Sequence, residues 1–133
     1  MRILRIMLVL SFLASAVSAP LVGQREDKEG KQWLSACSEP ASINVTGLWK
    51  SEDWGRISLS QREGSRNVLG AGDGWEISGV VSGKSVCLLF THKGSVAYSA
   101  RLNDDGPKQL SGVYARGLIS SSSKTKAMRL AKN

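Results

Sequence analysis

The residues best suited to chemistry are two carboxylates beside a tryptophan and a single histidine. Glu52 and Asp53 directly precede Trp54, and His92 is the one histidine of the chain. Carboxylates beside an aromatic ring are typical of sugar sites, because the ring stacks on the sugar and the carboxylates bond its hydroxyls. A histidine acting with Glu52 or Asp53 would instead provide the general base of a hydrolase. We expect Glu52 and Asp53 to lie in a turn at the rim of the fold, with Trp54 plugging its end. We expect His92 to be a surface residue. The prediction is therefore that the protein is not an enzyme.

Three further segments partly imitate ligand-binding or catalytic motifs. The glycine string Gly70–Gly74 is followed by no helical pattern, so it predicts a turn rather than a dinucleotide site. The segment Val80–Gly83 does not match a nucleophile elbow. Asp104 and Asp105 could bind a cation weakly, but they precede the turn signal Gly106-Pro107. A single histidine excludes a site with several histidine ligands. We therefore predict no catalytic residue, no cofactor and no metal.

The first residues indicate export. Arg2 and Arg5 form a positive start, and the apolar stretch Ile6–Leu13 is followed by small residues, which is the layout of a secretory signal peptide over Met1–Ala19. A membrane span would need about 20 apolar residues, so we predict no transmembrane segment. The alternative is a buried N-terminal helix. The segment Leu34–Cys37 imitates a lipoprotein cleavage box, but it does not directly follow the apolar stretch.

Export decides how the two cysteines are interpreted. An oxidising compartment favours a disulfide between Cys37 and Cys87, the only pair in the chain. Closing a loop of about fifty residues would stabilise the fold by about 4 kcal/mol in the chain-entropy model. Two separate buried thiols are the alternative. A catalytic cysteine would need a nearby base, and His92 is the only candidate.

Short β-patterned segments, separated by glycine, asparagine, aspartate and serine, fill the chain from residue 47 onward. The segments are Gly47–Lys50, Arg56–Gln61, Arg66–Leu69, Trp75–Val81, Lys84–Thr91, Ser95–Leu102, Gln109–Arg116 and Lys126–Ala131. Short links require antiparallel neighbours, and an antiparallel meander removes its exposed edges most simply by closing. We predict an all-β fold of about eight strands closed into a small barrel, with a two-sheet sandwich as the alternative. The organisation is a signal peptide over 1–19, a flexible leader over 20–36 and one barrel domain over 37–133.

Alternation along the strands predicts which side chains face the barrel interior. The expected interior residues are Trp49, Ile57, Leu59, Val68, Trp75, Ile77, Val86, Leu88, Phe90, Val96, Tyr98, Leu102, Leu110, Tyr114, Met128 and Leu130. Cys87 then points outward, so a bridge to Cys37 would hold the segment Trp33–Cys37 across the outer wall, where it would cover Leu89. An eight-stranded barrel can fill its interior with side chains or hold one small ligand, and the several large members favour a filled interior. Three glycines within strands, Gly47, Gly79 and Gly112, are interpreted as sites of curvature.

The start of the first strand carries a resemblance to a known superfamily. Gly47-Leu48-Trp49 resembles the opening of lipocalin and avidin-like barrels, the calycins. In avidins a polar residue two positions after the tryptophan and a serine six positions after it help to hold biotin. Ser51 matches the first position, but Gly55 occupies the second. The resemblance therefore implies a calycin-like barrel without a biotin site.

The positive charge lies mainly at the C-terminal end of the chain. The formal net charge is +7, of which residues 106–133 contribute +6, because this stretch holds six basic and no acidic residues. The five basic groups of residues 116–133 are spread out and no aromatic residues lie between them, so they predict a solvated face rather than a nucleic-acid interface.

Together these features predict an exported, non-enzymatic binding module for a small ligand, a glycan or a protein, located in the periplasm or outside the cell. The expected ligand-binding residues are Trp49, Ser51, Asp53, Trp54 and Trp75. The alternative is an inhibitor of an extracytoplasmic hydrolase, such as a protease or a lysozyme. A ligand-binding barrel should hold an apolar pocket of a few hundred Å³. An inhibitor should instead have a filled interior and exposed apolar residues.

Overall fold

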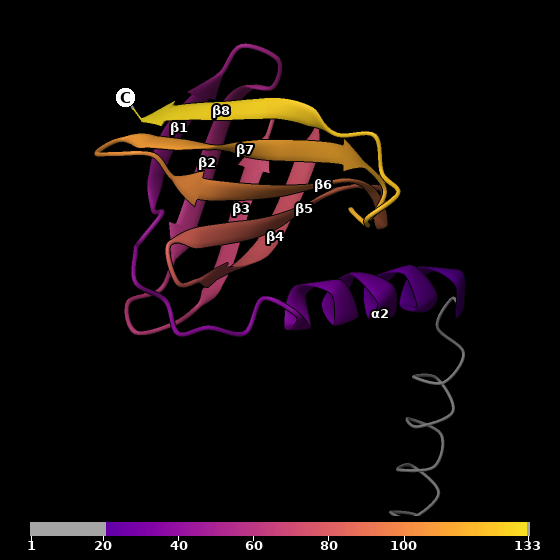
Figure 1. Ribbon diagram of the computed structural model, residues 1–133. Coiled ribbons are helices and arrows are strands. Elements are labelled where there is room, and N and C mark those ends of the chain that lie inside the picture. The colour runs from indigo at the N-terminus through magenta and orange to yellow at the C-terminus, as the bar shows by residue number, and fades with distance from the viewer. Residues whose placement is uncertain (1–20, 133) are drawn as a thin grey trace, which may run out of the picture.

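A computed structural model describes residues 21–132 and confirms the predicted barrel (Figure 1). Eight antiparallel strands follow one another in chain order, and the last pairs with the first. The strands are β1 (Gly47–Ser51), β2 (Gly55–Gln61), β3 (Asn67–Gly72), β4 (Trp75–Ser82), β5 (Ser85–His92), β6 (Ser95–Asp104), β7 (Gln109–Arg116) and β8 (Lys126–Lys132). The predicted signal peptide over residues 1–19 lies outside the described residues. No helix in the described part of the chain is long and apolar enough to cross a membrane.

Turn and strand glycines shape this meander. Between β5 and β6, Lys93 and Gly94 both have positive φ, 52° and 83°, which is the turn geometry that matches the twist of a hairpin. Within the strands, a Cβ on Gly79 would collide with the carbonyl oxygen of Cys87, and one on Gly112 would collide with that of Arg101. The neighbouring strand therefore approaches more closely there than a side chain would allow, as expected at points of curvature.

Large apolar side chains fill the barrel. The fully buried residues include Ile57, Leu88, Phe90, Leu102 and Leu130. All but one of the predicted interior residues belong to this core or pack against it. The core also contains three residues that the interior prediction omitted, namely Val45, Val81 and Ala100. The predicted filled interior is therefore what the packing shows.

Val96 is the exception, and a β-bulge explains it. Phe90 pairs with Tyr98, but the next residue, Thr91, pairs with Val96, so β6 holds one extra residue at this point. The extra residue reverses the alternation, and Val96 faces the outer wall. There it lies beside Gly30, where an added Cβ would be 3.5 Å from Val96 Cγ2.

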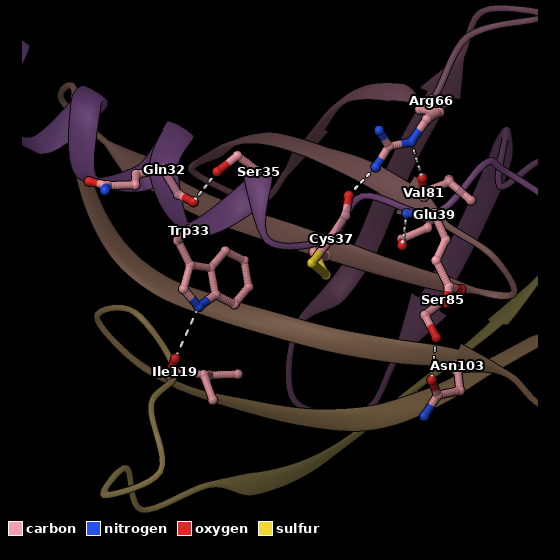
Figure 2. The surroundings of a disulfide bond; sticks show 12 residues. Gln32, Trp33, Ser35, Cys37, Glu39, Arg66, Val81, Ser85, Asn103 and Ile119 are labelled. Carbon is pink, nitrogen blue, oxygen red and sulfur yellow. Dashed lines mark hydrogen bonds between the residues drawn. A yellow bond between two sulfur atoms is a disulfide. The ribbon is translucent and has the colours of Figure 1, made fainter.

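Residues expected to form a flexible leader are instead largely helical. Helix α2 spans Leu21–Ser35 and lies against the outer wall of the barrel, contacting β5 and β6 (Figure 1). Gly30 is buried on Leu89, since an added Cβ would lie only 2.9 Å from Leu89 Cδ1. Trp33 donates its indole N–H to the carbonyl oxygen of Ile119 at 3.0 Å (Figure 2). The guanidinium of Arg101 lies 5.1 Å from the Trp33 ring centre. Tertiary contacts therefore stabilise a helix whose own apolar pattern is weak.

The predicted disulfide joins Cys37 to Cys87 at the end of this helix (Figure 2). Cys87 pairs with Arg101 on the outer face of the wall, and the bridge holds the N-terminal segment there, as expected. The contact with Leu89 comes from Gly30 of the helix rather than from the predicted segment Trp33–Cys37. Arg66 reinforces this attachment, because its guanidinium donates to the carbonyl oxygens of Cys37 and Val81.

Gln61 fastens the following segment, residues 41–46, to the end of the barrel. Its side chain is buried, with 7% exposed. The amide oxygen accepts from the N–H of Val45 at 2.9 Å, and the amide nitrogen donates to the carbonyl oxygens of Ile43 and Ser65 at 3.1 and 3.0 Å. One side chain therefore satisfies three backbone groups near the core.

Replacing both cysteines, Cys37→Ala with Cys87→Ala, should lower the free energy of unfolding by up to about 4 kcal/mol, because the unfolded chain loses a loop closure of fifty residues. Urea denaturation measures the loss. Reduction of the unaltered protein should shift the midpoint similarly. An unchanged midpoint in both experiments would show that the bridge does not constrain the unfolded chain.

Gln61→Ala should lower the free energy of unfolding by about 2–4 kcal/mol, because buried backbone groups lose their partners. Gln109→Ala is the matched control: Gln109 is exposed, and its replacement should change stability by less than about 0.5 kcal/mol. Equal effects of the two replacements in thermal or urea unfolding would contradict the assigned role of Gln61.

Candidate functional site

Trp54 closes one end of the barrel. It follows Ser51, Glu52 and Asp53 in the β1–β2 turn, and the hydroxyl of Ser51 accepts a hydrogen bond from the Trp54 backbone N–H at 3.4 Å. The indole lies 4.5 Å from Phe90, measured between ring centres. The structure thus places Trp54 where the sequence predicted a plug.

Three half-buried aromatic rings surround this plug. The ring centres of Tyr98 and Tyr114 each lie 5.2 Å from that of Trp54, both edge-to-face, and Trp75 lies at 5.7 Å. Trp75 also meets Tyr98 edge-to-face at 5.6 Å. Such mutually perpendicular pairs fix ring orientations. The rings form the floor of a hollow of about 650 Å³ at this end of the barrel, which we call the mouth.

Charged side chains of both signs line the rim of the mouth. Asp53 comes from the β1–β2 turn and Asp73 from the β3–β4 turn. Arg116 ends β7, Lys124 lies in the link between β7 and β8, and Lys126 begins β8. All five are exposed. The mouth can therefore offer carboxylate acceptors and cationic donors to one ligand.

The strand register places two of these cations beside the tyrosines. Tyr98 pairs with Arg116, and Tyr114 pairs with Lys126. Directly paired residues lie on the same face of a sheet, so Arg116 and Lys126 belong to the inward face at the point where the strands reach solvent. An anion seated on the tyrosines would therefore meet both cations.

The floor contains one unsatisfied hydrogen-bond donor. Among the described residues, Trp54 Nε1 is the one buried side-chain nitrogen or oxygen without a hydrogen-bond partner. Its surroundings are aromatic rings, which accept hydrogen bonds only weakly. The packing of Trp54 therefore rests on ring contacts rather than on polar bonds.

The predicted ligand-binding residues divide between the two ends of the barrel. Asp53, Trp54 and Trp75 lie together at the mouth, and Ser51 supports the turn that carries Trp54. Trp49 is 4% exposed and its indole donates to the carbonyl oxygen of Val45 at 2.9 Å, which places it in the core near the opposite end.

Several mouth residues were absent from the predicted site. Tyr98 and Tyr114 were expected in the interior, and the signal that places them at the mouth is their position near strand ends. Arg116 and Lys126 belonged to the basic C-terminal stretch, which was interpreted as a solvated face. The inward–outward alternation does carry this signal. Arg116 lies two positions after the inward Tyr114, and Lys126 lies two positions before the inward Met128, so both belong to the inward face.

The residues considered for catalysis or cation binding lie in turns or at the ends of strands, where His92 is the last residue of β5 and Asp104 the last of β6. His92 is exposed, and its Nδ1 lies 3.3 Å from the carbonyl oxygen of Gly74. Asp105 accepts a hydrogen bond from the hydroxyl of Ser111 at 3.1 Å, within the link between β6 and β7. Within residues 21–132, no group of three histidine, cysteine or acidic side chains is arranged to hold a metal ion.

No protein-family model, curated protein or solved structure matches the chain. The resemblance of Gly47-Leu48-Trp49 to calycins therefore stays a prediction.

Trp54→Ala should lower the free energy of unfolding by about 3 kcal/mol, because it removes the plug from four neighbouring rings. Trp75→Ala, which removes a ring from the floor of the mouth, should cost about 1–2 kcal/mol. The loss should be smaller because the neighbouring ring centres lie 5.6–6.5 Å from that of Trp75 but 4.5–5.7 Å from that of Trp54. Urea unfolding of both variants tests this order. A larger loss for Trp75→Ala would contradict the plug assignment.

Proposed function

We propose that the protein is a non-enzymatic binding module that takes a ring-bearing small ligand or a glycan residue at the mouth. The observation that carries the proposal is the aromatic floor of Trp75, Tyr98 and Tyr114, which is open to solvent and bordered by charges of both signs. The filled interior supports this location, because an internal ligand would have to displace core side chains.

The chemistry of the mouth favours a sugar with an acidic group. Aromatic faces stack on the apolar face of a sugar ring, and carboxylates such as Asp53 and Asp73 accept hydrogen bonds from its hydroxyls. Arg116 and Lys126 line the same hollow from β7 and β8, and a guanidinium binds a carboxylate through two parallel hydrogen bonds. A uronic acid residue presents all three partners at once.

We further propose that the module is exported. The disulfide between Cys37 and Cys87 supports this location, because such bridges persist in oxidising compartments. Signal-peptide features over residues 1–19 provide the route.

An inhibitor of an extracytoplasmic hydrolase is the second candidate function, and the wall of the barrel supplies the observation that favours it. Leu48 on β1 and Leu69 on β3 are 63% and 67% exposed, beside a filled interior. Exposed apolar side chains of this size are available for contact with a protein.

Titration with oligogalacturonate, followed by calorimetry and by tryptophan fluorescence, tests the mouth. Trp75→Ala should weaken binding at least tenfold. Arg116→Ala should weaken oligogalacturonate binding several-fold but should leave any binding of a neutral glucose oligomer unchanged. Arg62→Ala, an exposed cation in the link between β2 and β3, is the matched control. Failure of acidic and neutral oligomers alike to bind would refute the glycan proposal.

A further inference from the structure

The seam that closes the barrel is hydrogen-bonded over only part of its length. β8 pairs with β7 from Lys126 to Ala131, but with β1 only at Ala131 and Lys132. After Ser51, β1 enters the turn that carries Trp54 and departs from β8. Among the described residues, the span 126–130 therefore has a strand partner on one side only.

The register of β8 identifies the backbone groups that the incomplete pairing with β1 leaves without a hydrogen-bond partner. The N–H of Lys132 donates to the carbonyl oxygen of Lys108, just before β7, at 2.9 Å. Successive residues of a strand direct their N–H and C=O groups to opposite sides. Ala131, Arg129 and Ala127 therefore direct theirs toward β1, and only Ala131 meets a β1 partner there. The N–H and C=O groups of Ala127 and Arg129 form an unpaired edge.

This edge borders the largest hollow among those described here. The hollow, of about 1110 Å³, lies between β8, the β1–β2 hairpin and the outer face of β7, and we call it the edge groove. Its walls carry small residues, including Ala127, Ala131, Ser111 and Gly112. Small side chains leave room for the backbone of another chain beside β8.

The charges around the edge groove favour an acidic occupant. Lys50 and Arg56 are directly paired across β1 and β2, and both are exposed. Like charges in this position repel each other. Arg129 adds a third cation from β8, while Glu52 and Asp53 lie at the tip of the hairpin. Acidic side chains beside Lys50 and Arg56 would relieve the repulsion.

We propose that the edge groove binds an extended, acidic peptide segment of a partner protein, which adds to β8 as a strand. The backbone of the segment pairs with Ala127 and Arg129, and its acidic side chains face Lys50 and Arg56. Strand addition draws affinity from main-chain hydrogen bonds and specificity from alternate side chains. The edge groove shares Asp53 with the rim of the mouth but none of the aromatic residues of its floor, and the backbone pairing does not depend on the proposed glycan binding.

The test uses a synthetic eight-residue peptide of alternating glutamate and valine and measures amide hydrogen exchange by NMR. In the free protein, the amides of Ala127 and Arg129 should exchange rapidly, whereas those of Met128 and Leu130, directed toward β7, should exchange slowly. Saturating peptide should slow the exchange of Ala127 and Arg129 at least tenfold. No binding, or binding without this protection, would overturn the proposal.

Matched peptides and variants separate backbone pairing from charge. The same peptide with N-methylated alternate amides should lose at least tenfold in affinity, and a lysine-valine peptide should bind at least tenfold more weakly. Lys50→Glu with Arg56→Glu should weaken binding at least tenfold. The control pair, Arg62→Glu with Lys93→Glu in two other turns, should not. The assigned mode would be overturned if the N-methylated peptide or the lysine-valine peptide bound as tightly as the glutamate-valine peptide. It would also be overturned if the Lys50→Glu, Arg56→Glu variant bound that peptide as tightly as the unaltered protein does.

Discussion

The closure of one antiparallel sheet on itself is the constraint on which the rest of this structure depends. Once β8 returns to β1, every inward side chain shares a single interior, and an eight-stranded barrel is only wide enough for a core or one small ligand. Here Phe90, Leu88 and Leu102 belong to that core. The surfaces that remain accessible to a ligand are therefore the ends and the outer wall of the barrel.

The two ends of the barrel are closed by different physical means. At the mouth, Trp54 packs against aromatic rings and its indole N–H stays unpaired. At the other end, Gln61 binds backbone groups of the segment that precedes β1. An aromatic closure leaves ring faces available to a ligand, whereas a closure by saturated hydrogen bonds leaves few groups free. The difference explains why the mouth is the better candidate site.

The outer wall carries the other consequences of closure. Helix α2 covers β5 and β6, and the disulfide keeps it there, so this part of the wall is occupied. The incomplete seam between β8 and β1 leaves another part accessible. Alternation also divides the basic C-terminal stretch, because Lys126 lies on the inward face at the mouth while Arg129 lies on the outer face at the edge groove. A stretch that reads as one block of charge thus serves two separate surfaces.

The sequence by itself determined the strands, their antiparallel order, the disulfide and almost all of the core. These features depend on local patterns: alternation, turn residues and a single pair of cysteines. Only the tertiary structure decided the helix of residues 21–35, because its stability comes from contacts of Gly30 and Trp33 with the wall rather than from its own pattern. The bulge that turns Val96 outward and the register that brings Arg116 and Lys126 to the tyrosines are likewise pairings between strands. A single strand carries no record of its partner's register, so the mouth and the edge groove emerge only when the sheet closes.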